Sequence, residues 1–174
     1  KNIINSAVNN GQLIEYVPCA SEAVACSVAA GLKMAGQSPI VIVQSSGLAN
    51  MASCITSLLI PYEIYFPIIT SWRTYNAGDS EIQHEHLATK LPELIAAYGY
   101  DHEILDQKNI DLAISQINNA KDHKTICVLK KGTFSNVELE PHYRLDLSSK
   151  TSRSKYLSTL NEKFKHSEDL CIGT

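Results

Sequence analysis

Residues 39–50 read PIVIVQSSGLAN, an apolar run with β-branched side chains that leads directly into a short polar stretch with a glycine. An uninterrupted apolar run of this length is typical of a strand that is buried on both faces of a parallel sheet. Residues 39–43 are therefore predicted to form a strand, and residues 44–50 are predicted to form a polar loop at its carboxyl end. A helix is expected to follow over about residues 50–59.

The alternation of strands and helices continues on both sides of this stretch. Further strands are predicted at residues 13–17, 65–71, 102–105 and 125–130. Further helices are predicted at residues 2–8, 22–35, 86–98 and 109–119, with Ser21 as the N-cap of the second and Gly36 as its stop. Strands that alternate with helices form βαβ units, so the sequence predicts a three-layer α/β/α domain with a parallel sheet.

The bulk composition is that of a globular domain. The chain has 174 residues, of which 44% are hydrophobic and 19% charged, and this length can bury a sizeable core. A net charge of −3 gives no basic footprint for nucleic acid. No apolar run approaches the roughly 20 residues that span a bilayer, and the first residues are polar, unlike a signal peptide. We therefore expect a cytoplasmic protein with no nucleic-acid or membrane partner.

The five cysteines carry no metal-binding pattern. They form no CxxC pair and have no histidine at zinc-finger spacing. Cys26 and Cys127 stand in apolar elements. We expect free thiols, buried at these two positions, and neither a metal site nor a disulfide framework.

The character of the chain changes after Phe134. Residues 1–134 are expected to form one domain, whose amino end is truncated inside a helix. Residues 135–170 are polar at first and then place apolar side chains at helical spacing, which predicts a linker and a helix. Residues 171–174 belong to a stretch that resembles the start of a strand. We expect them to be the first residues of a further domain that is missing here.

Polar groups gather after three of the predicted strands. Glu22 stands alone among small apolar residues in PCASEAVACSVAAG at 18–31, QSSGLAN follows the strand at 39–43, and WRTYNAGDSEIQHEH follows the strand at 65–71. In open parallel sheets ligands bind outside the carboxyl ends of the strands, and long polar loops often carry function. These three places are therefore the candidate site.

Each of these residues also has a purely structural interpretation. Glu22 could be a first-turn carboxylate that is favoured by the helix dipole and faces water. Gly47 could only shape a turn, and Asn50 could only cap a helix. Arg73 and His84 could be solvated surface residues.

Taken in order along the chain, these motifs resemble the pyrimidine-binding domain of thiamine-diphosphate-dependent decarboxylases, over roughly residues 3–134. In that family a Glu opens an Ala-rich helix that ends in AAG, as in SEAVACSVAAG here, and a strand leads into a QNSGLGN loop, here QSSGLAN. The later motifs are a TSL at 56–58, a WRG-like turn at 72–74, a DEPQH-like segment at 79–84 and a KKGTF at 130–134. Within the family the motifs are most similar to phosphonopyruvate decarboxylases, and next to sulfopyruvate decarboxylases.

Four positions depart from the family's motifs. Ser45 stands where the family usually has Asn, Ala49 and Thr74 stand where it has Gly, and Ile82 replaces a Pro. These positions lie in the cofactor loop and the substrate loop. The four departures do not change the class of cofactor that the motifs imply, but they bear on which substrate the chain would bind.

The resemblance implies a catalytic role for Glu22. In this family the Glu on that helix hydrogen-bonds a ring nitrogen of the aminopyrimidine of thiamine diphosphate and shares the proton that starts the reaction. Burial among small apolar residues penalises the charged carboxylate, which suits this role. Gln44, Ser46, Gly47 and Asn50 are then expected to line the pyrimidine side of the cofactor, with Gly47 allowing close backbone approach.

The resemblance also places Arg73, Gln83 and His84 near the substrate. The guanidinium fork of Arg73 suits a phosphonate or sulfonate group. His84 is expected to donate a proton or hold the substrate carboxylate, which makes it the second catalytic candidate beside Glu22. No metal ligands are expected in this chain, because in this family the missing domain holds the diphosphate and its Mg²⁺.

The implied function is that of a carbon–carbon lyase in phosphonate biosynthesis, which converts 3-phosphonopyruvate to phosphonoacetaldehyde and CO₂. Two alternatives stay open: a sulfopyruvate decarboxylase alpha-type subunit, and a non-catalytic binding or regulatory module on the same scaffold. Because this family builds its site between domains of two chains, the isolated chain is expected to be inactive. A homo-oligomer is expected, with the Ala-rich helix as the candidate subunit contact.

Overall fold

The computed structural model describes residues 2–11, 15–76, 78 and 82–140, together with residues 152, 154, 155, 158, 159 and 162. Residues 1–138 and 139–174 form two separate units, and the fold below is that of the first. In the second unit, described residues within the predicted helix are helical. The strand expected at residues 171–174 lies outside the described residues, and the expected division into domains stays a prediction.

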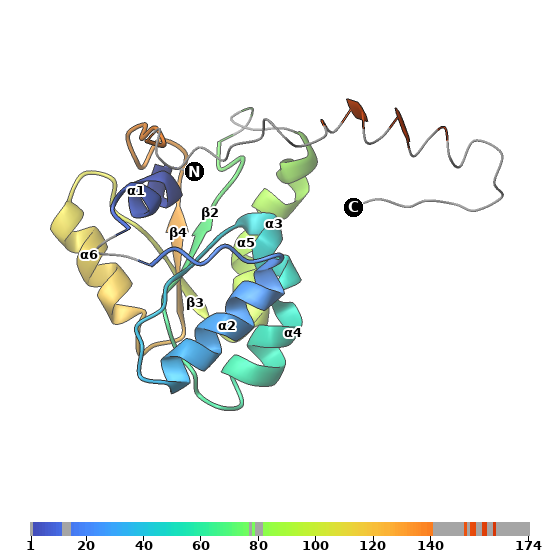
Figure 1. The fold of residues 1–174 in the computed structure, drawn as a ribbon. Coiled ribbons are helices and arrows are strands. Elements are labelled where there is room, and N and C mark those ends of the chain that lie inside the picture. Colours follow the sequence, from blue (N-terminus) through green and yellow to red (C-terminus); the bar gives the residue numbers. More distant parts are fainter. Residues whose placement is uncertain are drawn as a thin grey trace. The chain divides into compact units, whose positions relative to one another are not determined.

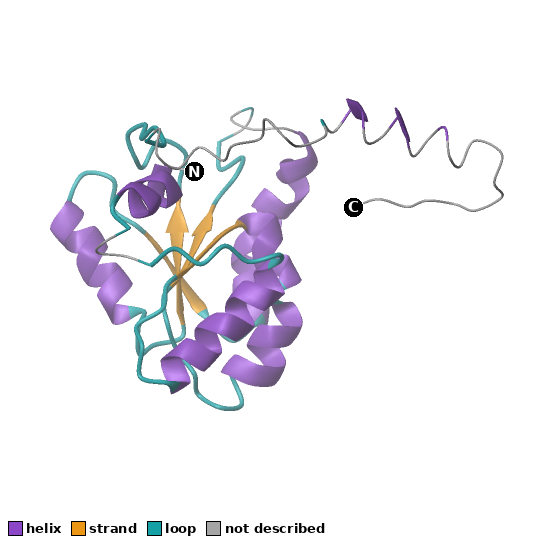
Figure 2. Cartoon of the chain, in the orientation of Figure 1, coloured by secondary structure: helices purple, strands orange, loops and turns teal. Residues whose placement is uncertain are grey.

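The described part of the chain contains four parallel strands in one sheet (Figures 1 and 2). They are β1 (Val41–Gln44), β2 (Ile68–Ser71), β3 (Asp101–Ile104) and β4 (Thr125–Leu129), in the spatial order β1-β2-β4-β3. The two central strands are the most apolar. In β4, Ile126, Cys127 and Val128 are all fully buried, as expected for a strand that is covered on both faces.

Helices cover both faces of this sheet. One group consists of α2 (Glu22–Met34), α3 (Ser45–Asn50), α4 (Ala52–Cys54) with the π-helical turn Ile55–Leu59, and α5 (Glu85–Ala97), which follows the 3₁₀ turn Ile82–His84. The other group, on the opposite side in Figure 1, consists of α1 (Asn2–Asn9) and α6 (Ile110–Asn119). The predicted three-layer α/β/α fold is therefore confirmed.

Alternation along the strands divides the core between these layers. Successive strand residues point to opposite faces of a sheet. Ile126 and Val128 accordingly join the core beneath α2 to α5, whereas Cys127 and Leu129 join a smaller cluster with Ile117 of α6. The larger cluster lies on the side that carries Glu22, so that side provides the rigid base of the candidate site.

The register of β1 and β2 aligns the two main polar stretches. Gln44 at the end of β1 pairs with Ser71 at the end of β2. Consequently α3, which starts at Ser45, and the turn that starts at Trp72 leave the sheet at the same edge. This is the edge at which ligands bind in open α/β sheets.

Three local predictions were wrong. The strand predicted at residues 39–43 was expected to be buried on both faces, but β1 lies at the edge of the described sheet and Ile42 is 36% exposed. Residues 45–50 form the helix α3 instead of a loop, because Leu48 is fully buried in the main core and Gly47 packs closely on α2. In the predicted strand at 13–17, residues 15–17 have no strand structure and are exposed, while residues 13 and 14 lie outside the described residues. Tyr16 and Val17 are 44% and 47% exposed and pair with no strand of the described sheet.

Candidate active site

Glu22 lies at the start of α2, where the local sequence fixes the beginning of the helix. The hydroxyl of Ser21 accepts a hydrogen bond from the backbone N–H of Val24 at 3.3 Å, which confirms Ser21 as the N-cap. At the other end Gly36 has a φ of +79°, as expected for a helix stop. Glu22 itself is half-buried, which disagrees with the interpretation that it simply faces water.

The helix α3 brings two predicted residues to Glu22. The side-chain amide of Asn50 donates a hydrogen bond to Oε2 of Glu22 at 3.1 Å. Gly47 is buried, and a Cβ at this position would lie 2.6 Å from Cγ and 2.7 Å from Oε1 of Glu22. Carbon atoms do not approach so closely without displacement. Glycine at position 47 therefore lets α3 pack directly on the Glu22 side chain. Gly47 does not shape a turn and Asn50 does not cap a helix, the two structural roles that the sequence alone would also allow.

These contacts hold the Glu22 carboxylate in place but occupy only part of its capacity to accept hydrogen bonds. Asn50 engages one oxygen, and Gly47 restricts where the side chain can move. A carboxylate has about four acceptor positions, so Glu22 keeps capacity to accept a hydrogen bond from a bound group or to share a proton with it. Since Asn50 is exposed, this contact reaches the molecular surface.

Gln44 and Ser46 lie together at the start of α3. The side-chain amide of Gln44 donates a hydrogen bond to the hydroxyl of Ser46. Gln44 occupies the N-cap position of α3, although its side chain makes no capping bond. The pair therefore forms a polar amino end of α3, directly before Gly47.

The predicted substrate residues follow β2. Arg73 is half-buried in the turn directly after the strand. Gln83 is exposed and His84 half-buried, both in the 3₁₀ turn before α5. Residues 79–81 of the same motif lie outside the described residues. The expected contacts of Arg73, Gln83 and His84 with a substrate stay predictions.

A group of aromatic and basic side chains that the sequence did not reveal anchors the turn after β2. The indole N–H of Trp72 donates to the backbone oxygen of Ala88 in α5 at 3.0 Å. The Trp72 ring meets the ring of Tyr75 edge-on, with centroids 5.0 Å apart, and the ammonium of Lys130 lies 4.0 Å from the Tyr75 centroid. These contacts join the WRT and KKGTF motifs, which are more than fifty residues apart, and hold Arg73 between fixed neighbours.

Thr74 has an unusual backbone conformation within this turn. Its φ is +59°, a region in which a β-branched residue is a genuine outlier. Only 8% of the residue is exposed, and its hydroxyl has no hydrogen-bond partner among the residues that the structure describes. The family motif has glycine at this position, and a positive φ is the physical reason why glycine fits there.

Substituting Thr74→Gly is expected to raise the free energy of unfolding by about 1–2 kcal/mol, because it relieves the φ strain and removes an unpaired buried hydroxyl. Urea denaturation of the variant and the parent measures the difference. Glu63→Gly is the matched control, since Glu63 also has a positive φ of 52° but is exposed. It should gain less. An equal or lower stability for Thr74→Gly would contradict this account of the turn.

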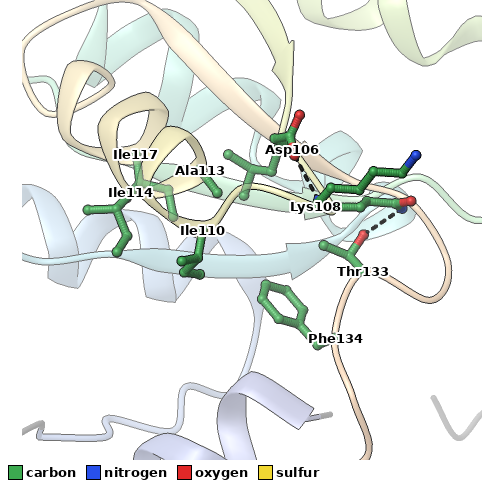
Figure 3. Close-up of a pocket in the computed structure, with 10 residues that line it drawn as sticks. Asp106, Lys108, Ile110, Ala113, Ile114, Ile117, Thr133 and Phe134 are labelled. Atoms are coloured by element: carbon green, nitrogen blue, oxygen red, sulfur yellow. Dashed lines mark hydrogen bonds between the residues drawn. The ribbon is translucent and has the colours of Figure 1, made fainter.

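A separate pocket of about 190 Å³ lies between α6 and the segments that follow β3 and β4 (Figure 3). Its lining is mainly apolar, from Ile110, Ala113, Ile114, Ile117 and Phe134. Its polar groups bind one another: the backbone N–H groups of Asn109 and Lys108 donate to Asp106 and lower the pKa of that carboxyl. None of the predicted site residues lines this pocket, so we do not assign it a catalytic role.

The described residues contain no group of three or more His, Cys, Asp or Glu side chains that could hold a metal ion. None of the helices in the described ranges is both long enough and apolar enough to cross a membrane.

The three-layer fold, with a half-buried carboxylate beside the carboxyl edge of its parallel sheet, is compatible with a domain of an α/β decarboxylase. Comparison with known proteins identifies specific decarboxylases to which the chain is similar. The chain is 32% identical to a sulfopyruvate decarboxylase of Methanosarcina acetivorans over 80 residues, which is 46% of this chain and 20% of that protein. It is 36% identical to a phosphonopyruvate decarboxylase of Streptomyces viridochromogenes over 89 residues, or 51% of this chain and 22% of the relative.

A phosphonopyruvate decarboxylase of Streptomyces hygroscopicus is 35% identical over 103 residues, which is 59% of this chain and 25% of the relative. The chain therefore spans a quarter or less of the length of the curated relatives that it matches. No protein-family profile matches the chain. The relatives confirm the resemblance to phosphonopyruvate and sulfopyruvate decarboxylases that the motifs indicated.

Proposed function

We propose that this chain is the pyrimidine-binding part of a thiamine-diphosphate-dependent 2-oxo acid decarboxylase. We further propose that the substrate is 3-phosphonopyruvate and that the products are phosphonoacetaldehyde and CO₂. The observation that carries this proposal is the half-buried Glu22 carboxylate, held by Asn50 at 3.1 Å and packed against Gly47. Two of the three relatives described above are named phosphonopyruvate decarboxylases, which supports the choice of substrate.

The residues around Glu22 fit the aminopyrimidine of thiamine diphosphate. When bound, the cofactor supplies the electron sink for decarboxylation. Glu22 would hold a proton between its carboxyl group and a ring nitrogen of the cofactor. Asn50 would keep the carboxyl oriented through its bond to Oε2. Gly47 would leave room for the side chain that carries out this step.

The residues that we assign to the substrate come from the turn after β2 and the start of α5. Arg73 would bind the phosphonate oxygens with its guanidinium fork, and Gln83 would add a neutral hydrogen-bonding group. His84 would hold the substrate carboxylate or supply a proton to the product. The rigid packing of Trp72 on α5 would keep Arg73 and His84 in a constant relation to each other.

We propose that a second domain, in the same chain or in a partner chain, binds the diphosphate group and its Mg²⁺. The described residues contain no cluster of acidic side chains that could do so. On this proposal the isolated chain is inactive, and a homo-oligomer assembles the complete site.

The outer face of α2 is the surface that we propose as a contact in that oligomer. Val24, Val28 and Leu32 are 45%, 39% and 38% exposed and follow one another at four-residue spacing. Residues at this spacing form one stripe along a helix. The buried residues of α2, such as Cys26 and Ala30, lie on its opposite side.

The product of the complete reading frame, supplied with thiamine diphosphate and Mg²⁺, provides the decisive test. Aldehyde release is measured with phosphonopyruvate, sulfopyruvate and pyruvate side by side. We expect the highest kcat/KM with phosphonopyruvate. A preference for sulfopyruvate would favour the activity named for the Methanosarcina relative. Cofactor binding without turnover of any substrate would favour a regulatory module, and a failure to bind the cofactor would contradict the proposal as a whole.

A further inference from the structure

We propose that Lys130 is a specificity-determining residue, which binds the phosphonate group of the substrate together with Arg73 and favours a doubly charged anion over a singly charged one. Lys130 directly follows β4, and Arg73 lies in the turn directly after β2. The inference rests on the proposed function, because it names the part of the proposed substrate that Lys130 binds.

The order of the strands brings together the two segments that carry these basic residues. β2 and β4 are adjacent and parallel, and Ser71 pairs with Leu129 at their carboxyl ends. The pairing continues past the end of β2, since the backbone N–H of Trp72 donates to the backbone oxygen of Leu129 at 2.7 Å. Adjacent strands lie about 4.8 Å apart, so Arg73 and Lys130 follow neighbouring points on the same edge of the sheet.

Beyond this edge the two segments turn to opposite faces of the sheet. The chain after β2 leads to α5, whose residues Leu91 and Ile95 belong to the larger core cluster. The chain after β4 leads to α1 on the other face, where the side-chain amide of Asn5 donates to the backbone oxygen of Val137 at 2.7 Å (Figure 1). Adjacent strands with diverging connections define the topological switch point of an open α/β sheet, and this is where ligands bind.

The ammonium of Lys130 keeps its full charge at this point. It lies 4.0 Å from the centroid of the Tyr75 ring, and the Lys130 residue is half-buried. No ion pair of the described residues includes Lys130. An ammonium has three N–H donors, and a ring face covers only one side of it. Lys130 therefore retains both the charge and the donors that an anion requires.

The aromatic rings around Lys130 hold the ammonium in place before a ligand arrives. Tyr75 meets the ring of Trp72 edge-on at 5.0 Å, and Trp72 is itself bonded to α5 through the backbone oxygen of Ala88. Tyr75 is 39% exposed, so an anion in solution can reach this group. A side chain that is already held loses less conformational freedom on binding, which favours affinity.

The charge of the anion decides how much Lys130 contributes to binding. A fully ionised phosphonate carries two negative charges, a sulfonate carries one, and the methyl group of pyruvate carries none. The guanidinium fork of Arg73 matches the oxygens of either acid group. A second cation attracts each anion in proportion to its charge. Lys130 should therefore favour phosphonopyruvate most, sulfopyruvate less, and pyruvate not at all.

The test substitutes Lys130→Gln in the full-length protein and measures kcat/KM for the three acids. We expect a decrease of about 10–100-fold for phosphonopyruvate, about 3–10-fold for sulfopyruvate and less than about twofold for pyruvate. A merely structural role for Lys130 would lower all three values alike. Lys130→Arg keeps the charge and the contact with Tyr75, so it should retain most of the preference. Lys124→Gln is the matched control, because Lys124 is exposed and precedes β4 at the opposite end of the strand.

A second measurement needs no turnover. Methylphosphonate and methanesulfonate are added to the full-length protein at equal ionic strength and at a pH where the phosphonate is fully ionised, and Tm is recorded. Since a ligand of the folded state raises Tm, methylphosphonate should raise it more than methanesulfonate does. Lys130→Gln should lose this additional gain, and Lys124→Gln should keep it.

The two measurements separate a failure of this inference from a failure of the proposed function. Equal losses for the three acids in Lys130→Gln, unchanged kinetics with phosphonopyruvate, or a methylphosphonate gain in Tm that does not depend on Lys130 would overturn the role of Lys130 while leaving decarboxylation in place. A parent protein that decarboxylates none of the acids, but gains Tm from methylphosphonate through Lys130, would contradict the proposed function and support the anion site.

Discussion

Substituting Glu22→Gln in the full-length protein is expected to lower kcat of the proposed decarboxylation by about 10²–10⁴-fold, the range that a positioned acid–base group contributes. Glutamine has nearly the same shape, and its amide oxygen can still accept the hydrogen bond that Asn50 donates at 3.1 Å. It cannot share the proton that Glu22 would hold with a ring nitrogen of the proposed cofactor. The loss should therefore fall on kcat, with the fold unchanged by circular dichroism and by urea denaturation.

Glu15→Gln is the matched control for this substitution. Glu15 is exposed and lies outside α2, so the same loss of one charge should leave kcat and KM close to those of the parent. If Glu22→Gln retained full activity, the carboxylate would be structural and the alternative of a non-catalytic binding module would gain support. Equal losses in both variants would point to net charge instead of a specific role for Glu22.

Substituting Gly47→Ala is expected to lower both stability and activity. The added Cβ would lie 2.6 Å from Cγ and 2.9 Å from Cδ of Glu22, so either Glu22 or the whole of α3 must move. Overpacking of this kind costs about 1–3 kcal/mol. A displacement of the carboxyl group by about 1 Å costs on the order of 10²-fold in rate. Urea denaturation and kcat/KM of the full-length protein measure the two effects.

Gly31→Ala provides the comparison. Gly31 lies within α2, and a Cβ there would meet nothing within 4 Å. Because alanine favours a helix over glycine, this variant should be more stable by about 0.5–1 kcal/mol. The opposite signs of the two glycine substitutions would show that the loss at position 47 comes from its contact with Glu22. A Gly47→Ala variant as stable and active as the parent would contradict the close packing.

The buried strands could be predicted because apolar runs with β-branched side chains mark them in the sequence. The apolar runs that became β2 and β4 need cover on both faces, and a sheet between two helical layers provides it. The run that became β1 has the same character, yet β1 lies at the edge of the described sheet and Ile42 is 36% exposed. The segment 44–50 was misjudged for the opposite reason. Its Ser, Gly and Asn residues favour turns locally, whereas burial of Leu48 and the packing of Gly47 on α2 stabilise a helix. Tertiary contacts thus overrode local preference.

The site was only partly accessible to sequence reasoning. Glu22 attracted attention as a carboxylate in apolar surroundings, and Gly47 and Asn50 as members of a polar segment after a strand. Their mutual contact depends on how α2 and α3 pack, which no spacing along the chain encodes. The contact of Lys130 with Tyr75 was missed for the same reason, because it joins segments that meet only through the order of the sheet.

The contact between Gly47 and Glu22 also constrains how this protein can change over evolutionary time. The two positions share one small volume, so the size allowed at position 47 depends on the length of the side chain at position 22. While glutamate occupies position 22, selection should tolerate only glycine at position 47. A homologue with a larger residue at position 47 is expected to carry a shorter one at position 22, and with it to have given up the reach of the carboxyl group. Position 47 would thus indicate, in any new sequence of this kind, whether the carboxylate can still do its work.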